Sequence, residues 1–160
     1  MSSSDRRQFL SLLAALPVAA CGFTPAYAPG AAGGKLRGRI AVQEPTTRDA
    51  FAFVGRLETR LGRAEAPAYD LTYTLATSRA GGGISPDNEI TRYTLKGTAT
   101  YTLTDRATGT RVTGGTVKSF TSWSATGTTV AGIAAEGAAA ERLMTILADD
   151  IVARLLAETP

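Results

Sequence analysis

Residues 90–105 read ITRYTLKGTATYTLTD, a nearly continuous alternation of apolar and polar side chains. Successive side chains of a β-strand point to opposite faces, so this period of two indicates one long strand that is buried on one face and solvated on the other. The side chains expected on the buried face are Tyr93, Leu95, Ala99, Tyr101 and Leu103. Those expected on the solvent face are Arg92, Thr94, Lys96, Thr98, Thr100 and Thr102.

The segment that follows this strand predicts an antiparallel partner. A tight turn over residues 105–109 returns the chain into a second strand over residues 111–123. The alternation of this second strand slips around Gly114-Gly115. A β-bulge at that pair would restore Val117 or Phe120 to the apolar side.

The segments that precede the long strand predict two more strands. Residues 69–76 alternate in the same way and end in a Gly-rich turn over residues 80–88, which we expect to be long and mobile. Residues 35–43 also alternate and indicate a first, half-buried strand. The sheet is therefore expected to have four strands.

Two amphipathic helices are expected to cover this sheet. The first begins at Thr46, which stands three residues before Asp49 in a spacing that resembles a capping box. Its apolar stripe is Phe53, Val54, Leu57 and Leu61, opposite Arg48, Arg56, Thr59 and Arg63. The second helix spans residues 130–158, with its apolar stripe at Leu143, Met144, Leu147, Ile151 and Leu155 and with Glu141, Arg142, Thr145 and Asp149 outside. The prediction is one α+β domain over residues 35–160, with two helices packed on one face of a four-stranded, mostly antiparallel sheet.

The N-terminal residues predict export and a lipid anchor. Residues 1–20 have the layout of a signal peptide, in which two arginines precede an apolar run that is far shorter than the roughly 20 residues a spanning helix needs. The following Val18-Ala19-Ala20-Cys21 resembles a lipobox, so we expect cleavage before Cys21 and an N-acyl diglyceride on that cysteine. The arginine pair also fits a twin-arginine signal, which leaves the export route open. Residues 21–34 are rich in Gly, Pro and Ala and are expected to form a flexible tether.

The composition argues against catalysis. The chain contains no histidine and one cysteine, so the common metal sites and Ser-His or Cys-His pairs are excluded. Asp149 and Asp150 are adjacent on a helix and point in different directions, while Asp87 and Glu89 lie in a turn. We expect no enzyme activity and no cofactor other than the covalent lipid. The net charge of +3 is small and does not indicate a nucleic-acid partner.

The threonines of the expected solvent face have two interpretations. Threonine favours strands, so an ordinary solvated sheet face accounts for them. The alternative is a polar face that is presented to a partner protein, which would also cover the edges of the sheet.

Taken in order, the anchor, the hairpin and the C-terminal helix resemble the LptE family of outer-membrane lipoproteins. The motifs that carry this resemblance are CGFTPAY at residues 21–27, RYTLKGTATYTL at residues 92–103, VKSF at residues 117–120 and LADDIVARL at residues 147–155. The resemblance implies a lipid-anchored domain on the periplasmic face of the outer membrane that plugs the β-barrel LptD, helps it to assemble and serves lipopolysaccharide transport. It also makes Arg92, Lys96 and Lys118 candidate contacts for lipopolysaccharide phosphates.

This chain departs from the family at two loops. Residues 81–88 and 128–132 contain no basic residue, although some members carry basic residues there. Two other interpretations stay open: a free-standing periplasmic lipoprotein that binds a small ligand or peptide, and an enzyme that uses carboxylates, for example on glycans.

The anchor can be tested by the substitution Cys21→Ser. We expect the variant to lose its acyl chains and to be released or mislocalised, because the chains of a lipoprotein together contribute about 0.8 kcal/mol per buried methylene. Palmitate labelling and membrane fractionation measure the two effects. Continued labelling of the variant would show that Cys21 is not the acylated residue, and a variant that lacks lipid but stays bound to a barrel would make the anchor secondary.

Overall fold

The computed structural model describes residues 32–125 and 128–158. The elements are α2 (Ala32–Leu36), β1 (Ile40–Val42), α3 (Arg48–Leu61), β2 (Tyr69–Ile84), β3 (Ile90–Asp105), β4 (Arg111–Ser124) and α4 (Thr129–Glu158). The predicted signal peptide, Cys21 and the tether up to residue 31 lie outside the described residues.

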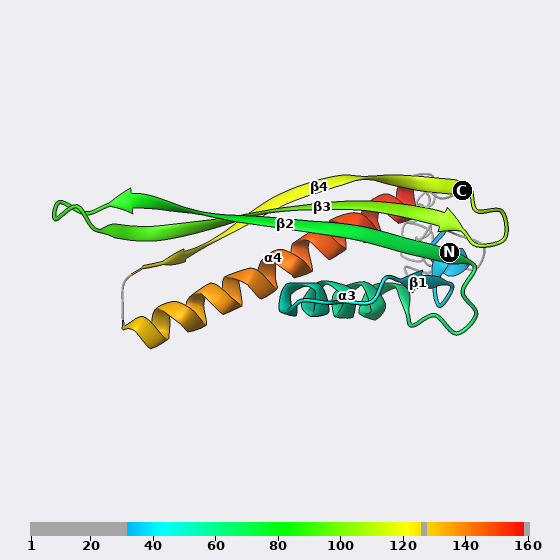
Figure 1. The fold of residues 1–160 in the computed structure, drawn as a ribbon, viewed down its shortest axis with the longest axis horizontal. Coiled ribbons are helices and arrows are strands. Elements are labelled where there is room, and N and C mark those ends of the chain that lie inside the picture. Colours follow the sequence, from blue (N-terminus) through cyan, green and yellow to red (C-terminus); the bar gives the residue numbers. More distant parts are fainter. Residues whose placement is uncertain (1–31, 126–127, 159–160) are drawn as a thin grey trace, which may run out of the picture.

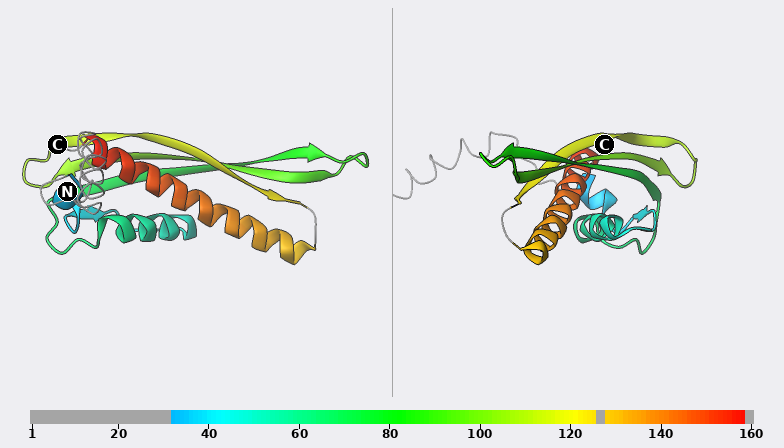
Figure 2. Two further views of the ribbon diagram at one scale, coloured as in Figure 1. Left: turned by 180° about the vertical axis from the view of Figure 1, so that it is seen from behind. Right: turned by 60° about the vertical axis from the view of Figure 1, so that its left-hand side comes forward.

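The four strands form one mixed sheet in the order β1-β2-β3-β4. Strand β1 runs parallel to β2, whereas β2, β3 and β4 form an antiparallel meander. Helices α3 and α4 lie on the same face of this sheet, and the far end of the β2-β3 hairpin projects past both of them (Figures 1 and 2). The two-layer α+β fold expected from the sequence is confirmed.

The core lies between the two helices and the inner face of the sheet. All five predicted stripe residues of α4 have no exposed surface, and those of α3 are buried as well. On β3, Leu95, Ala99, Tyr101 and Leu103 are buried against them, as the alternation predicted. Burial of each large apolar side chain contributes about 1.5 to 3 kcal/mol, so these stripes hold the two layers together.

Gly97 sets the distance between α4 and the sheet. It lies on the inner face of β3 between Leu95 and Ala99, directly under the helix. A Cβ atom on Gly97 would lie 2.9 Å from Cδ2 of Leu143 and 3.0 Å from Cδ1 of Leu147. The first distance is shorter than real Cβ contacts and the second is tighter than most, so any side chain at this position would force the two buried leucines to move.

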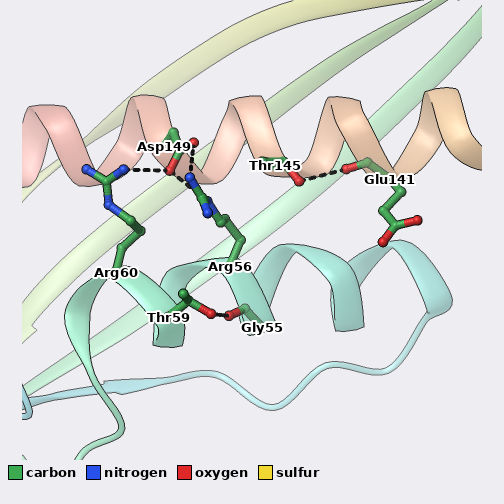
Figure 3. Close-up of polar contacts among 7 residues, drawn as sticks. All are labelled: Gly55, Arg56, Thr59, Arg60, Glu141, Thr145 and Asp149. Atoms are coloured by element: carbon green, nitrogen blue, oxygen red, sulfur yellow. Dashed lines mark hydrogen bonds and ion pairs between the residues drawn. The ribbon is translucent and has the colours of Figure 1, made fainter.

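An ion pair joins the two helices beside the core (Figure 3). Arg56 donates hydrogen bonds from Nε and a terminal nitrogen to the two carboxylate oxygens of Asp149, at 2.9 and 2.8 Å. A terminal nitrogen of Arg60 lies 3.4 Å from the same carboxylate. The hydrogen bond to Asp149 raises the pKa of Arg56. Arg56 and Asp149 both lie outside the core, as predicted, and are about one third exposed. They meet because α3 packs against the side of α4, so that residues flanking the two stripes come together.

The first predicted strand, residues 35–43, is correct only at Ile40–Val42. Residues 32–36 form the short helix α2, which takes in the last three residues assigned to the tether. The side chain of Leu36, the last residue of this helix, is fully buried. Gly38 then turns the chain with φ at 69° while its N–H donates to the carbonyl of Leu61 at 2.7 Å. Burial of one leucine therefore overrides the local alternation.

The predicted long turn over residues 80–88 is mostly strand. β2 continues to Ile84. Its residues pair with β3 without a break up to Gly82, and Ile84 pairs with Ile90. Because β3 offers a backbone partner to each of them, pairing outweighs the low strand propensity of glycine. The turn shrinks to the residues around Asn88, whose φ is 61°.

The irregularity in β4 lies nearer the hairpin turn than predicted. Leu103 pairs with Thr113 and Thr104 with Arg111, so Val112 is the extra residue rather than the Gly114-Gly115 pair. The bulge returns Val117 to the core, where it is 2% exposed. Phe120 instead points to the other face and is 66% exposed.

The ends of α3 show why this helix starts where it does. Its N-cap is Thr47, one residue after the predicted Thr46, and the Thr47 hydroxyl accepts from the N–H of Ala50 at 3.2 Å. That bond satisfies one of the free amides of the first turn.

In the described part of the chain, no helix combines the length and apolar character needed to cross a bilayer.

The packing role of Gly97 can be tested by Gly97→Val. We expect this variant to lose about 1 to 3 kcal/mol of unfolding free energy, because the new side chain overpacks against two fully buried leucines. The matched control is Gly82→Val on β2, where an added Cβ has no atom within 4 Å. Urea unfolding of both variants measures the difference, and equal stability would show that α4 does not depend on this glycine.

Candidate functional site

The face of the sheet that points away from α3 and α4, called here the outer face, is polar across three strands. Its side chains on β3 are the predicted solvent-facing set from Arg92 to Thr102. The hydroxyls of Thr94 and Ser122 lie 3.2 Å apart, and those of Thr100 and Thr116 lie 3.1 Å apart. Cross-strand hydroxyl pairs of this kind stabilise a sheet while they leave its surface hydrophilic.

The structure brings two of the three candidate basic residues together on this face. Lys96 pairs across the sheet with Phe120, and Lys118 pairs with Thr98. Lys96 and Lys118 are therefore diagonal neighbours, whose backbones lie about 7 to 8 Å apart in such a sheet. Arg92 lies four residues before Lys96 on the same strand, which is about 13 Å at the usual rise. It is opposite Ser124 and marks the far end of the same face.

These three cations are available to a partner. Arg92, Lys96 and Lys118 are all exposed. Within residues 32–125 and 128–158, none of them takes part in an ion pair. Their charges are therefore not neutralised by the described part of the chain, and an anion at the surface would find at least two of them within reach.

Phe120 is a residue of this site that sequence reasoning did not assign. The sequence left open whether Val117 or Phe120 joined the core, and the bulge at Val112 settles this in favour of Val117. Phe120 then stands exposed beside both lysines, directly opposite Lys96 and two residues from Lys118 on β4. We name Arg92, Lys96, Lys118 and Phe120 the outer-face patch.

The sheet is twisted (Figures 1 and 2), and its outer face carries open hollows. One hollow of about 480 Å³ beside Arg92 is lined by Thr91, Arg92, Ser122, Trp123 and Ser124. The Trp123 ring itself belongs to the core on the inner face, where it stacks on Tyr93 with centroids 5.4 Å apart. Small-molecule sites are usually deep and mostly apolar, so this geometry suits a macromolecular or headgroup contact better.

The carboxylates considered for catalysis are not assembled into a site. Asp149 is held by Arg56 and Arg60 in the helix layer. Asp87 and Glu89 lie at the tip of the β2-β3 hairpin, far from the helix pair (Figure 1). The hydroxyl of Tyr101 is buried and has no hydrogen-bond partner among the described residues, and burial raises its pKa. A phenol in that state is a poor acid or base at neutral pH.

Comparisons with known proteins agree on the fold. Among solved structures, a candidate lipoprotein from Caulobacter crescentus is 21% identical, with a TM-score of 0.64 and a match that covers 79% of this chain and 93% of that one. Rare lipoprotein B from Shewanella oneidensis is 12% identical, with a TM-score of 0.58 and coverage of 74% and 92%. A minor lipoprotein from Acinetobacter baumannii is 19% identical, with a TM-score of 0.58 and coverage of 75% and 91%. At these identities the likeness shows a shared fold.

The sequence comparisons identify the family. No curated protein sequence is significantly similar to this chain. The family model LptE, described as lipopolysaccharide-assembly, matches residues 38–155. That range runs from the turn before β1 into the last turns of α4 and includes the whole sheet. The chain therefore belongs to the LptE lipopolysaccharide-assembly family.

Proposed function

We propose that this chain is an outer-membrane lipoprotein, anchored through Cys21 on the periplasmic face, that plugs the LptD β-barrel and assists the transport and insertion of lipopolysaccharide. It acts by contact and catalyses no reaction. The observation that carries the proposal is the one-sided sheet, which has a core-packed inner face and a hydroxyl-rich outer face that no described element covers. The lumen of a large β-barrel is polar, so a domain lodged there needs a polar exterior.

The end of the molecule that carries the β2-β3 hairpin tip, called here the distal end, supports a position inside the barrel. At the hairpin tip, Ile84 is 71% exposed and Ile90 is 44% exposed, and the two are paired across the strands. At the first turns of α4, Val130 and Ile133 are 77% and 68% exposed, and this helix end lies toward the same end of the molecule (Figure 1). Large apolar side chains gathered at one end of a small domain are typical of a contact surface.

The outer-face patch supports contact with lipopolysaccharide, which carries phosphate groups. Lysine and arginine side chains bind phosphate through charge-assisted hydrogen bonds, and neighbouring hydroxyls add further donors. Lys96 and Lys118 offer two such charges within one diagonal step of the sheet. Phe120 beside them offers an apolar surface to an acyl chain or sugar ring.

The plug role is tested by purification from native membranes. We expect the tagged full-length lipoprotein, solubilised from outer membranes in mild detergent, to bring down LptD at equal stoichiometry, because a plug is enclosed by its barrel. Depletion of the chain should lower mature LptD and surface lipopolysaccharide. A chain that is recovered alone, with normal LptD and lipopolysaccharide after depletion, would instead be a free-standing binding lipoprotein.

The phosphate contacts are tested by a double substitution, Lys96→Gln with Lys118→Gln. We expect binding of purified protein to lipopolysaccharide to weaken about tenfold, because two charged hydrogen bonds are lost at an exposed site. Binding should also become less dependent on salt. The matched control, Arg37→Gln with Arg142→Gln, removes two exposed positive charges away from the outer face. Equal weakening in both variants would show that net charge, rather than the patch, governs binding.

A further inference from the structure

Strand β2 has a long unpaired edge on the side away from β3. Strand β1 pairs only with residues 69–71 of β2, although β2 extends to Ile84. On this side of β2, no strand of the described residues lies beyond that short overlap. We name Leu75–Gly81 the β2 edge.

Two hydrogen bonds show which backbone groups face outward along this edge. The N–H of Gln43 donates to the carbonyl of Leu71 at 2.9 Å, and the Gln43 side-chain oxygen accepts from the N–H of Tyr73 at 3.2 Å. Odd-numbered residues of β2 therefore point their N–H and C=O groups away from β3. The register with β3 is unbroken from Tyr69 to Gly82, so the same holds at Leu75, Thr77, Arg79 and Gly81.

The pairing stops because the chain turns away. The Gln43 side chain takes the place of one more strand residue, after which Pro45 leads into the cap of α3. Beyond this point the outward N–H and C=O groups of the β2 edge recur about every 7 Å, at two residues per repeat. They meet no partner among the described residues.

The β2 edge also lacks the features that normally keep an exposed edge from pairing. The other edge strand, β4, has a bulge at Val112 and carries Lys118, both of which discourage an incoming strand. The β2 edge has no proline, lysine or bulge. Its one charged residue, Arg79, is engaged by Glu136 of α4 at 3.0 and 3.1 Å and lies over the Tyr93 ring at 5.3 Å.

We propose that an extended segment of the barrel partner adds to the β2 edge as a further strand. This proposal rests on the proposed function above. A row of alternating donors and acceptors at this spacing is satisfied by polypeptide in the β conformation, and not by a lipid or a sugar. Because the strands of a closed barrel already pair with one another, the added segment is a loop or a terminal segment of that partner. The side chains of the β2 edge on the outer face of the sheet are small, which leaves room for larger residues of the added strand. They are Ala76, Ser78 and Ala80.

Substitution at Thr77 tests this inference in the full-length, lipid-anchored protein. Thr77→Pro removes an N–H that points to the open edge, and proline is tolerated at such positions of edge strands. The matched control Thr77→Ala removes the side chain and keeps the N–H. We expect Thr77→Pro to lower the amount of LptD that co-purifies after a salt wash about tenfold, and Thr77→Ala to leave it unchanged.

A photo-crosslinking amino acid at Thr77 gives an independent readout if Thr77→Pro fails to fold. A crosslink to LptD that maps to one short segment supports strand addition. A crosslink to a second copy of this chain, or to its own residues 21–31, overturns it, as does the absence of any crosslink. If wild-type protein brings down LptD and Thr77→Pro brings down as much as Thr77→Ala, the inference fails and the plug role stands. If wild-type protein brings down no LptD, both fail.

Discussion

The packing of α4 onto the inner face of β3, across Gly97, is the contact on which the rest of the structure depends. Every stripe residue of α4 is fully buried there, and the missing side chain at Gly97 is what allows Leu143 and Leu147 to reach the strand. Strands of this length would otherwise expose a continuous apolar face. Because one long helix covers most of that face, the domain needs no second sheet and keeps its other face open.

One face of the sheet is buried in the core, so the surfaces that can serve a function lie elsewhere on the sheet. The inner face of the sheet is committed to packing, so a partner that binds the sheet meets its outer face, its two edges or the hairpin tip. Each of these has a different chemistry: hydroxyls with Lys96 and Lys118 on the outer face, backbone groups along β2, and isoleucines at the hairpin tip. The described residues thus offer a partner several surfaces of distinct chemistry.

Helix α3 determines how much of the sheet is left uncovered. It is less than half the length of α4 and is fixed beside it by the pair of Arg56 with Asp149. Both side chains of that pair are about one third exposed, so solvent weakens it and its main effect is orientation. Helix α3 and strand β1 lie beside the half of β2 that begins at Tyr69. The half that ends at Ile84 therefore has no described helix or strand at its open edge (Figure 1).

The sequence alone determined the fold class, the four strands, both helix stripes and the basic residues of the outer face, because periods of 2 and 3.6 residues record which side of each element is buried. Local pattern could not reveal contacts made between elements far apart in the chain. The strand character of the glycines at 81–82, the placement of Asp149 against Arg56 and the exposure of Phe120 each depend on such a contact: a cross-strand partner, a neighbouring helix and a bulge. The open edge of β2 was also beyond the sequence, because only the tertiary structure shows that β1 ends after three residues and that no other described strand pairs with that edge of β2.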